Sequence, residues 1–97
     1  MVDDIVDTAG SLTKASGALI GAGAASVSAV VTHGVLSGKA IDNIEASSLN
    51  ELLVTDSIPL SPRAKQCSKI RVASVSELLA RAIRRIHKSD SISSLFI

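Results

Sequence analysis

Short apolar runs rich in β-branched residues alternate along this chain with stretches in which apolar residues have helical spacing. Such runs are typical of buried parallel strands, and they predict strands at residues 2–6, 26–32, 51–58 and 69–75. The intervening stretches predict helices at residues 12–20, 37–47 and 74–87. Because strands and helices alternate, we predict an α/β fold with a largely parallel sheet flanked by helices.

The clearest helix signal lies in residues 74–87. One face of this predicted helix is apolar and consists of Leu78, Leu79, Ala82, Ile83 and Ile86. Ser74 and Glu77 have the spacing of a capping box, which predicts that the helix begins at Ser74.

Other element ends are marked by single residues. Gly21 and Gly23 predict the end of the first helix, and Ser37 is a predicted N-cap of the second. Pro59 and Pro62 predict a loop before the last strand.

Residues 15–38 contain no Lys, Arg, Asp or Glu, and a stretch of this length can cross a bilayer. Gly17 and Gly21 also have the GxxxG spacing of packed membrane helices. The stretch is rich in small residues, however, and its large apolar residues form two separate groups, which favours a helix, a turn and a strand. We therefore predict no membrane span, and a small membrane protein is the alternative. Because Asp3 and Asp4 stand where a secretory signal carries cations, we expect a cytoplasmic protein.

Composition narrows the possible partners. With 97 residues the chain is one domain at most, and its net charge of +1 argues against recognition of nucleic acid by bulk electrostatics. The sequence has no Trp or Tyr and a single Phe, so it offers no aromatic platform for stacking bases. Cys67 is the only cysteine and is predicted to be a small buried hydrophobic residue in a reducing compartment.

Polar residues follow several of the predicted strands, at residues 7–11, 32–34 and 55–57. Parallel strands end at a common edge of the sheet, where ligands of α/β proteins bind. The pattern therefore predicts a ligand-binding edge. Within it, His33 is predicted to be structural and Asp56 to cap the following turn.

The loop at residues 7–11 carries the most specific chemistry. Free backbone N–H groups, two hydroxyls and the start of a helix can together hold a phosphate, and Gly10 permits a backbone bend. The loop lacks the lysine and the spacing of a nucleotide P-loop. Asp3 and Asp4 are suited to binding sugar hydroxyls or magnesium. An ordinary helix cap preceded by solvated acids remains the alternative.

The segment "VDDIVDTAGS" resembles the 5-phosphoribosyl-binding signature of type I phosphoribosyltransferase folds. Further segments resemble the C-terminal portion of ribose-phosphate pyrophosphokinases, and together they cover essentially the whole chain. These segments are "VVTHGVLSGKAIDNIE", "ELLVTDSIPL", "KIRVASVSELLARAIRRIH" and "SISSLF".

The resemblance implies that residues 1–97 are the C-terminal part of a phosphoribosyltransferase-like domain. The family transfers diphosphate from ATP to the 1-hydroxyl of ribose 5-phosphate, with magnesium. By resemblance, Asp3 and Asp4 hold the ribose hydroxyls directly or through magnesium. The residues implied to hold the 5-phosphate are Asp7, Thr8, Ala9, Gly10 and Ser11. Ser11 stands where Thr is usual and Ala9 where Gly is frequent, which keeps the hydroxyl and the small size.

The tail implies a second site by resemblance. In the family, which forms homo-oligomers, the matching segment contributes to an allosteric nucleotide site between subunits. Ser91 and Ser93 would then contact phosphate and Phe96 the base. The alternative is an unattached chain end.

The ATP-binding residues, the flexible basic loop and the main magnesium-binding histidine of the family lie upstream of the matching region. We therefore expect this chain to hold ribose 5-phosphate but to have little or no activity alone. The alternatives are a non-catalytic binding or regulatory module, and a part of a nucleobase phosphoribosyltransferase, which shares the loop but not the later segments.

Overall fold

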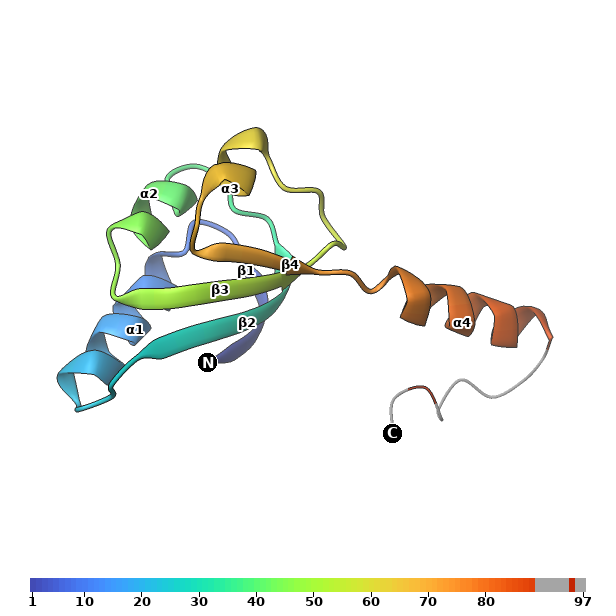
Figure 1. The fold of residues 1–97 in the computed structure, drawn as a ribbon, viewed down its shortest axis with the longest axis horizontal. Helices are drawn as coiled ribbons and strands as arrows, with labels where there is room; N and C mark the ends of the chain where they lie inside the picture. The colour runs from blue at the N-terminus through green and yellow to red at the C-terminus, as the bar shows by residue number, and fades with distance from the viewer. Residues whose placement is uncertain (89–94, 96–97) are drawn as a thin grey trace.

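The computed structural model describes residues 1–88 and residue 95. Its strands form one parallel sheet in the order β1-β2-β3-β4 (Figure 1). The strands are β1 (Val2–Val6), β2 (Val27–Gly34), β3 (Leu49–Thr55) and β4 (Ile70–Ala73). The helices are α1 (Gly10–Gly21), α2 (Ala40–Glu45), α3 (Pro62–Gln66) and α4 (Ser76–His87). The predicted α/β class with a parallel sheet is confirmed.

The first three helices lie on one face of the sheet. Consecutive strands are neighbours in the sheet, and connections between parallel strands share one preferred hand, so successive crossovers in the same direction place α1, α2 and α3 on the same side. An ion pair between Arg63 of α3 and Asp42 of α2 joins two of these helices. The opposite face carries Val2, Val30 and Leu53 in one row across the strands, and Val2 is 86% exposed.

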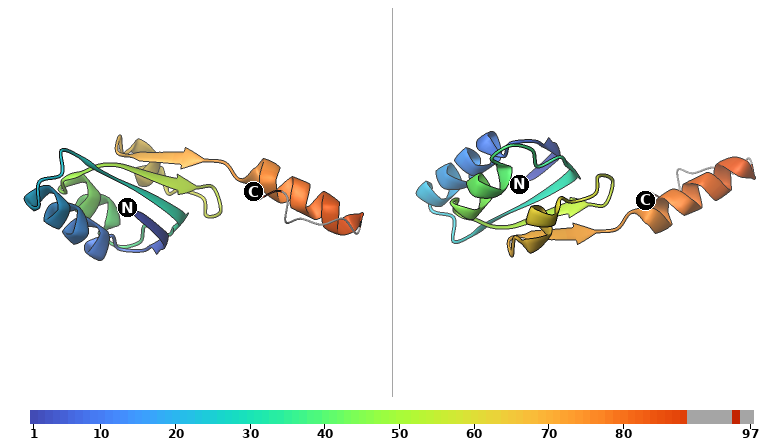
Figure 2. Two further views of the ribbon diagram at one scale, coloured as in Figure 1. Left: turned by 90° about the horizontal axis from the view of Figure 1, so that it is seen from below. Right: turned by 90° about the horizontal axis from the view of Figure 1, so that it is seen from above.

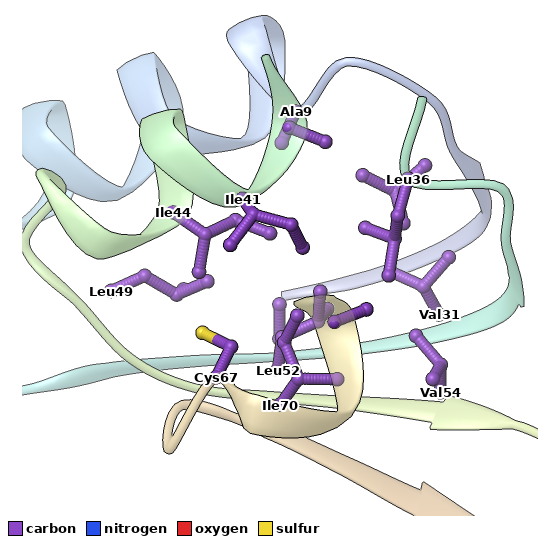
Figure 3. Close-up of a cluster of buried hydrophobic side chains, with 14 of the residues drawn as sticks. Ala9, Val31, Leu36, Ile41, Ile44, Leu49, Leu52, Val54, Cys67 and Ile70 are labelled. Atoms are coloured by element: carbon purple, nitrogen blue, oxygen red, sulfur yellow. The ribbon is translucent and has the colours of Figure 1, made fainter. Parts of the chain in front are cut away.

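The hydrophobic core lies between the helices and the central strands (Figure 3). Alternate residues of β2 point into it, as the period of a strand requires. Ile44 of α2 and Leu52 of β3 are among the completely buried side chains. Cys67 is also buried in this cluster, as predicted from the sequence.

Gly34 is the last residue of β2 and lies close to the side chain of Val54 on the neighbouring strand β3. A Cβ atom at this position would lie 2.9 Å from Cγ1 of Val54, which is closer than carbon atoms normally approach. Glycine therefore lets β2 end beside β3, at the edge where β1 also ends.

The prediction of a loop at Pro59 and Pro62 is confirmed at Pro59, which lies outside any helix or strand. It is wrong at Pro62, because α3 begins there. The side chain of Ser61 caps this helix by accepting a hydrogen bond from the N–H of Ala64 at 3.2 Å. Proline suits the first turn of a helix, where its missing N–H has no partner to lose. Pro62 therefore begins α3 and does not extend the loop.

Two predicted N-caps are also wrong. The helix after Ser37 begins only at Ala40, and the Ser37 hydroxyl donates to the Asp7 carboxylate instead. The capping box at Ser74 does not form, because α4 begins at Ser76 and the Ser74 hydroxyl donates to Asp56. In both cases the serine hydroxyl donates to a carboxylate distant in sequence, and the Ser74 oxygen also accepts the N–H of Ser76 at 3.2 Å.

Helix α4 confirms the helix predicted over this region, but its apolar face remains exposed. Leu79, Ile83 and Ile86 are 55%, 67% and 65% exposed. The helix extends away from the sheet in every view (Figures 1 and 2). Periodicity identifies which residues share a face, whereas burial requires a second surface, and the described residues do not supply one to this helix.

The uncharged stretch at residues 15–38 forms the end of α1, a turn and β2, as predicted. Across the described residues, the structure contains no helix with the length and apolar character needed to span a membrane.

Asp56 connects the end of β3 to the segment that leads into α4. Its carboxylate accepts the Ser74 hydroxyl at 2.6 Å and the Val75 N–H at 2.9 Å. These two hydrogen bonds, that of Ser74 first, hold the pKa of Asp56 below its ordinary value of 3.8. Asp56 therefore holds the segment that follows β4 beside the end of β3, and its carboxylate is not used only to cap the local turn.

We expect this connection to weaken in acid. Because the pKa of Asp56 is lower in the folded than in the unfolded protein, the contact stabilises the fold above the unfolded pKa, and this contribution is lost as the pH falls through the folded pKa. An NMR titration of the Asp56 carboxyl carbon should give a midpoint below 3.8, and Ser74→Ala should raise it. The same midpoint in both proteins would contradict this assignment.

Candidate functional site

A cavity of about 280 Å³ opens where β1 ends and α1 begins. The residues that line it come from β1, the following loop and the first turn of α1. They are Asp3, Ile5, Val6, Asp7, Thr8, Ala9, Gly10, Ser11 and Leu12. The cavity therefore lies at the carboxyl end of a parallel strand, the edge at which the sequence predicted a ligand.

The loop turns sharply at Ala9. This residue is the N-cap of α1 and has a left-handed backbone conformation, with φ of 64° and ψ of 13°. It is only 5% exposed and belongs to the hydrophobic cluster (Figure 3). Its carbonyl accepts hydrogen bonds from the N–H and the hydroxyl of Thr13, at 3.0 and 2.8 Å, which hold the turn against the helix.

The bend assigned to Gly10 from the sequence is therefore wrong, because Gly10 is already helical and the bend lies at Ala9. The absence of a side chain at Gly10 has a different consequence. A Cβ there would meet only the Thr8 hydroxyl, at 3.9 Å, so it would occupy open space beside Thr8. Gly10 leaves the cavity open to a group that approaches the backbone.

The wall of the cavity is rich in hydrogen-bond donors. The first N–H groups of α1, at Gly10, Ser11 and Leu12, have no acceptor within the helix, and this end carries the positive end of its dipole. Within residues 1–88, the hydroxyls of Thr8 and Ser11 make no hydrogen bond to protein. The first turn of α1 contains no acidic residue. Such an arrangement suits an anion with several oxygen atoms.

Of the residues predicted for ribose 5-phosphate, the structure brings all but Asp4 together around the cavity. Asp3 lines the cavity with the loop residues, whereas Asp4 does not. Neighbouring residues of a strand point to opposite faces, so the two carboxylates diverge. The N–H of Asp4 donates to the Asp3 carboxylate at 2.8 Å. Asp3, and not Asp4, is thus the carboxylate that lines this cavity.

Two residues that sequence analysis did not assign to the site contact the loop from the other side. Ser37 donates its hydroxyl to the Asp7 carboxylate and its N–H to the Asp7 carbonyl at 3.0 Å. The Asn43 side chain donates to the carbonyl of Thr8 at 2.8 Å. These contacts join residues 30 and 35 positions apart, so no local sequence signal marks them.

His33 lies at the same edge of the sheet, and its Nδ1 is 2.8 Å from the Ser57 hydroxyl. Thr55 donates to the carbonyl of Thr32 at 2.6 Å, so polar contacts join the ends of β2 and β3 here. These contacts agree with the structural role predicted for His33.

Neither a metal centre nor the tail site can be built from the described residues. In the ranges that the structure describes, no three His, Cys, Asp or Glu side chains gather so that they could hold a metal ion. Ser91, Ser93 and Phe96, predicted for a nucleotide site, lie outside the described residues.

Comparison with known proteins places these features in a family. The family model of the phosphoribosyl synthetase-associated domain matches residues 1–97. Ribose-phosphate pyrophosphokinase of Xanthomonas axonopodis pv. citri is 58% identical over 97 residues, which are all of this chain and 30% of the relative. The enzyme of the same name from Bordetella pertussis is 56% identical over 96 residues, or 99% of this chain and 31% of the relative.

A solved structure agrees with this result. The crystal structure of phosphoribosylpyrophosphate synthetase from Mycobacterium smegmatis matches with a TM-score of 0.85 and 33% identity, over 91% of this chain and 29% of that one. This chain thus spans about 30% of the length of the relatives it matches. Because the family model covers every residue, the chain belongs to the phosphoribosyl synthetase-associated domain family.

Proposed function

We propose that this chain forms the ribose 5-phosphate site of a protein that transfers diphosphate from ATP to that sugar, giving phosphoribosyl pyrophosphate for nucleotide biosynthesis. The observation that carries the proposal is the cavity at the start of α1, because the segment that resembles the 5-phosphoribosyl signature lines it with hydrogen-bond donors. The names of the relatives support the same substrate class.

In this proposal each part of the cavity has a separate role. The backbone N–H groups from Thr8 to Leu12 and the hydroxyls of Thr8 and Ser11 hold the 5-phosphate. Asp3, which lies on β1 and lines the cavity, accepts hydrogen bonds from ribose hydroxyls. Asp7 is tied to Ser37 and fixes the loop at its start. The site thus binds and orients the sugar so that its 1-hydroxyl is available for transfer.

Magnesium belongs to the family's chemistry, where it offsets the charge of the transferring phosphates. Among the described residues no three His, Cys, Asp or Glu side chains gather, and Asp3 is the acidic side chain on β1 that lines the cavity, so further protein ligands of the ion and those of ATP are proposed to lie in other parts of the family's longer proteins. Phosphoryl transfer depends on positioning and charge stabilisation, and this chain supplies only the positioning of one substrate. We therefore expect no ATP-dependent phosphoribosyl pyrophosphate formation by this chain alone.

The proposal is tested by titrating the chain with ribose 5-phosphate and following its backbone amides by NMR. We expect saturable shifts of the amides from Asp7 to Leu12, and much weaker shifts with ribose, which lacks the phosphate. Equal responses to both sugars, or shifts confined to another part of the chain, would contradict a phosphate site at this loop. Turnover of ATP and ribose 5-phosphate by the chain would overturn the separate expectation that it is inactive.

A further inference from the structure

We infer that Ser37 and Asn43 are positioning residues that orient the Asp7–Ala9 backbone for phosphate and thereby set the affinity of the loop. The inference rests on the proposed function, which it extends from the residues that touch the ligand to those that hold them. Ser37 lies in the connection between β2 and α2, and Asn43 lies on α2.

The contacts of both residues converge on two consecutive peptide groups. The carbonyl of Asp7 accepts the N–H of Ser37 at 3.0 Å, and the carbonyl of Thr8 accepts the side-chain amide of Asn43 at 2.8 Å. The Ser37 hydroxyl adds a hydrogen bond to the Asp7 carboxylate. Gly38, the next residue, lies close to the loop, since a Cβ added there would be 4.0 Å from Cγ2 of Thr8. The segment that begins α2 therefore supports the loop directly.

The orientation of these carbonyls fixes the orientation of the following N–H groups. In a trans peptide the C=O and the N–H point in opposite directions. Since the carbonyls of Asp7 and Thr8 are held toward Ser37 and Asn43, the N–H groups of Thr8 and Ala9 point away from these two residues. Among the described residues neither N–H donates to a protein acceptor, and both residues line the cavity. Adjacent N–H groups aimed into one concavity are a common form of anion site.

Without these contacts the backbone at residues 7–9 would not favour this orientation. Ala9 has a positive φ, which is unfavourable for a residue with a side chain, so the Thr8–Ala9 peptide needs external hydrogen bonds to stay in place. Asn43 is only half-buried, whereas Ile41 and Ile44 anchor α2 in the core. Loss of the Asn43 amide should therefore affect the loop much more than the fold.

The test compares the dissociation constant for ribose 5-phosphate in the full chain and its variants. Asn43→Ala is expected to weaken binding by up to about tenfold, which is the effect of losing one hydrogen bond between neutral groups, and Ser37→Ala to weaken it by a similar factor. Asn43→Asp keeps the size of the side chain but cannot donate to the Thr8 carbonyl, so it should bind as weakly as Asn43→Ala. Ser37→Thr retains a hydroxyl and should restore most of the affinity.

Asn50→Ala and Ser48→Ala are the matched controls, because both residues are exposed and neither side chain makes a hydrogen bond within the described part of the chain. They should bind like the original chain. A further readout is independent of ligand: the amide signals of Thr8 and Ala9 should broaden or shift in Asn43→Asp, while signals of β2 and β3 stay unchanged.

The outcomes separate the two proposals. If the original chain binds ribose 5-phosphate and Asn43→Asp binds equally well, the positioning role is overturned and the proposed function stands. If the original chain does not bind, the proposed function fails, and the positioning role fails with it because there is no affinity to set. Should Asn43→Ala fail to fold, the isosteric Asn43→Asp decides the matter.

Discussion

Leu52→Ala is expected to lower the free energy of unfolding by about 2–5 kcal/mol. Leu52 is completely buried in the central part of the sheet, where it is in register with Ala29 of β2 and Ile70 of β4. Its truncation removes apolar contacts and leaves a cavity that the close-packed strands cannot fill. In a domain of this size such a loss is a large part of the total stability. Urea unfolding followed by circular dichroism measures the effect.

The same substitution on α4 provides the control. Leu79 is also a leucine of a regular element, but more than half of its surface is exposed. Leu79→Ala should change the free energy of unfolding by no more than about 0.5 kcal/mol, as is usual for surface positions. If Leu79→Ala cost as much as Leu52→Ala, the apolar face of α4 would be covered in solution, contrary to this structure.

Ala9→Val is expected to weaken binding of ribose 5-phosphate at least tenfold. A β-branched residue is strained at a φ of 64°, by about 1–3 kcal/mol, and the buried position leaves no room for two added methyl groups. The loop must therefore open, and the N–H groups on either side of Ala9 would no longer converge. Dissociation constants from NMR titration measure the loss.

Two variants isolate the backbone as the cause. Ala9→Gly should retain binding, because glycine adopts the left-handed conformation without strain. Ala18→Val places the same change on the exposed side of α1, away from the loop, and should bind normally. Normal binding by Ala9→Val would show that the conformation at this position does not control the site.

Much of this protein can be predicted from local patterns. The strand at residues 26–32 and the helix at residues 74–87 are marked by periodicity, which depends only on neighbouring residues. The loop at residues 7–11, proposed to bind phosphate, is marked by small residues and hydroxyls in a short segment, so the chemistry available to it is visible in the sequence. Several wrong predictions concern serine or proline. Ser37 and Ser74 can cap a helix but donate here to carboxylates distant in sequence, and Pro62 can lie in a loop but begins a helix.

The sequence by itself determined the α/β class, the order of the strands and of the helices α1, α2 and α4, and the loop that lines the cavity, because each depends on residues close together in the chain. Only the tertiary structure decided that the bend lies at Ala9, that Asp3 and Asp4 diverge, and that Asn43 supports the loop across 35 positions. These features depend on hydrogen bonds and packing between segments that meet only in the folded protein. The direction of a peptide group or a side chain at the site is therefore set by the fold, while the kind of chemistry available there is set by the sequence.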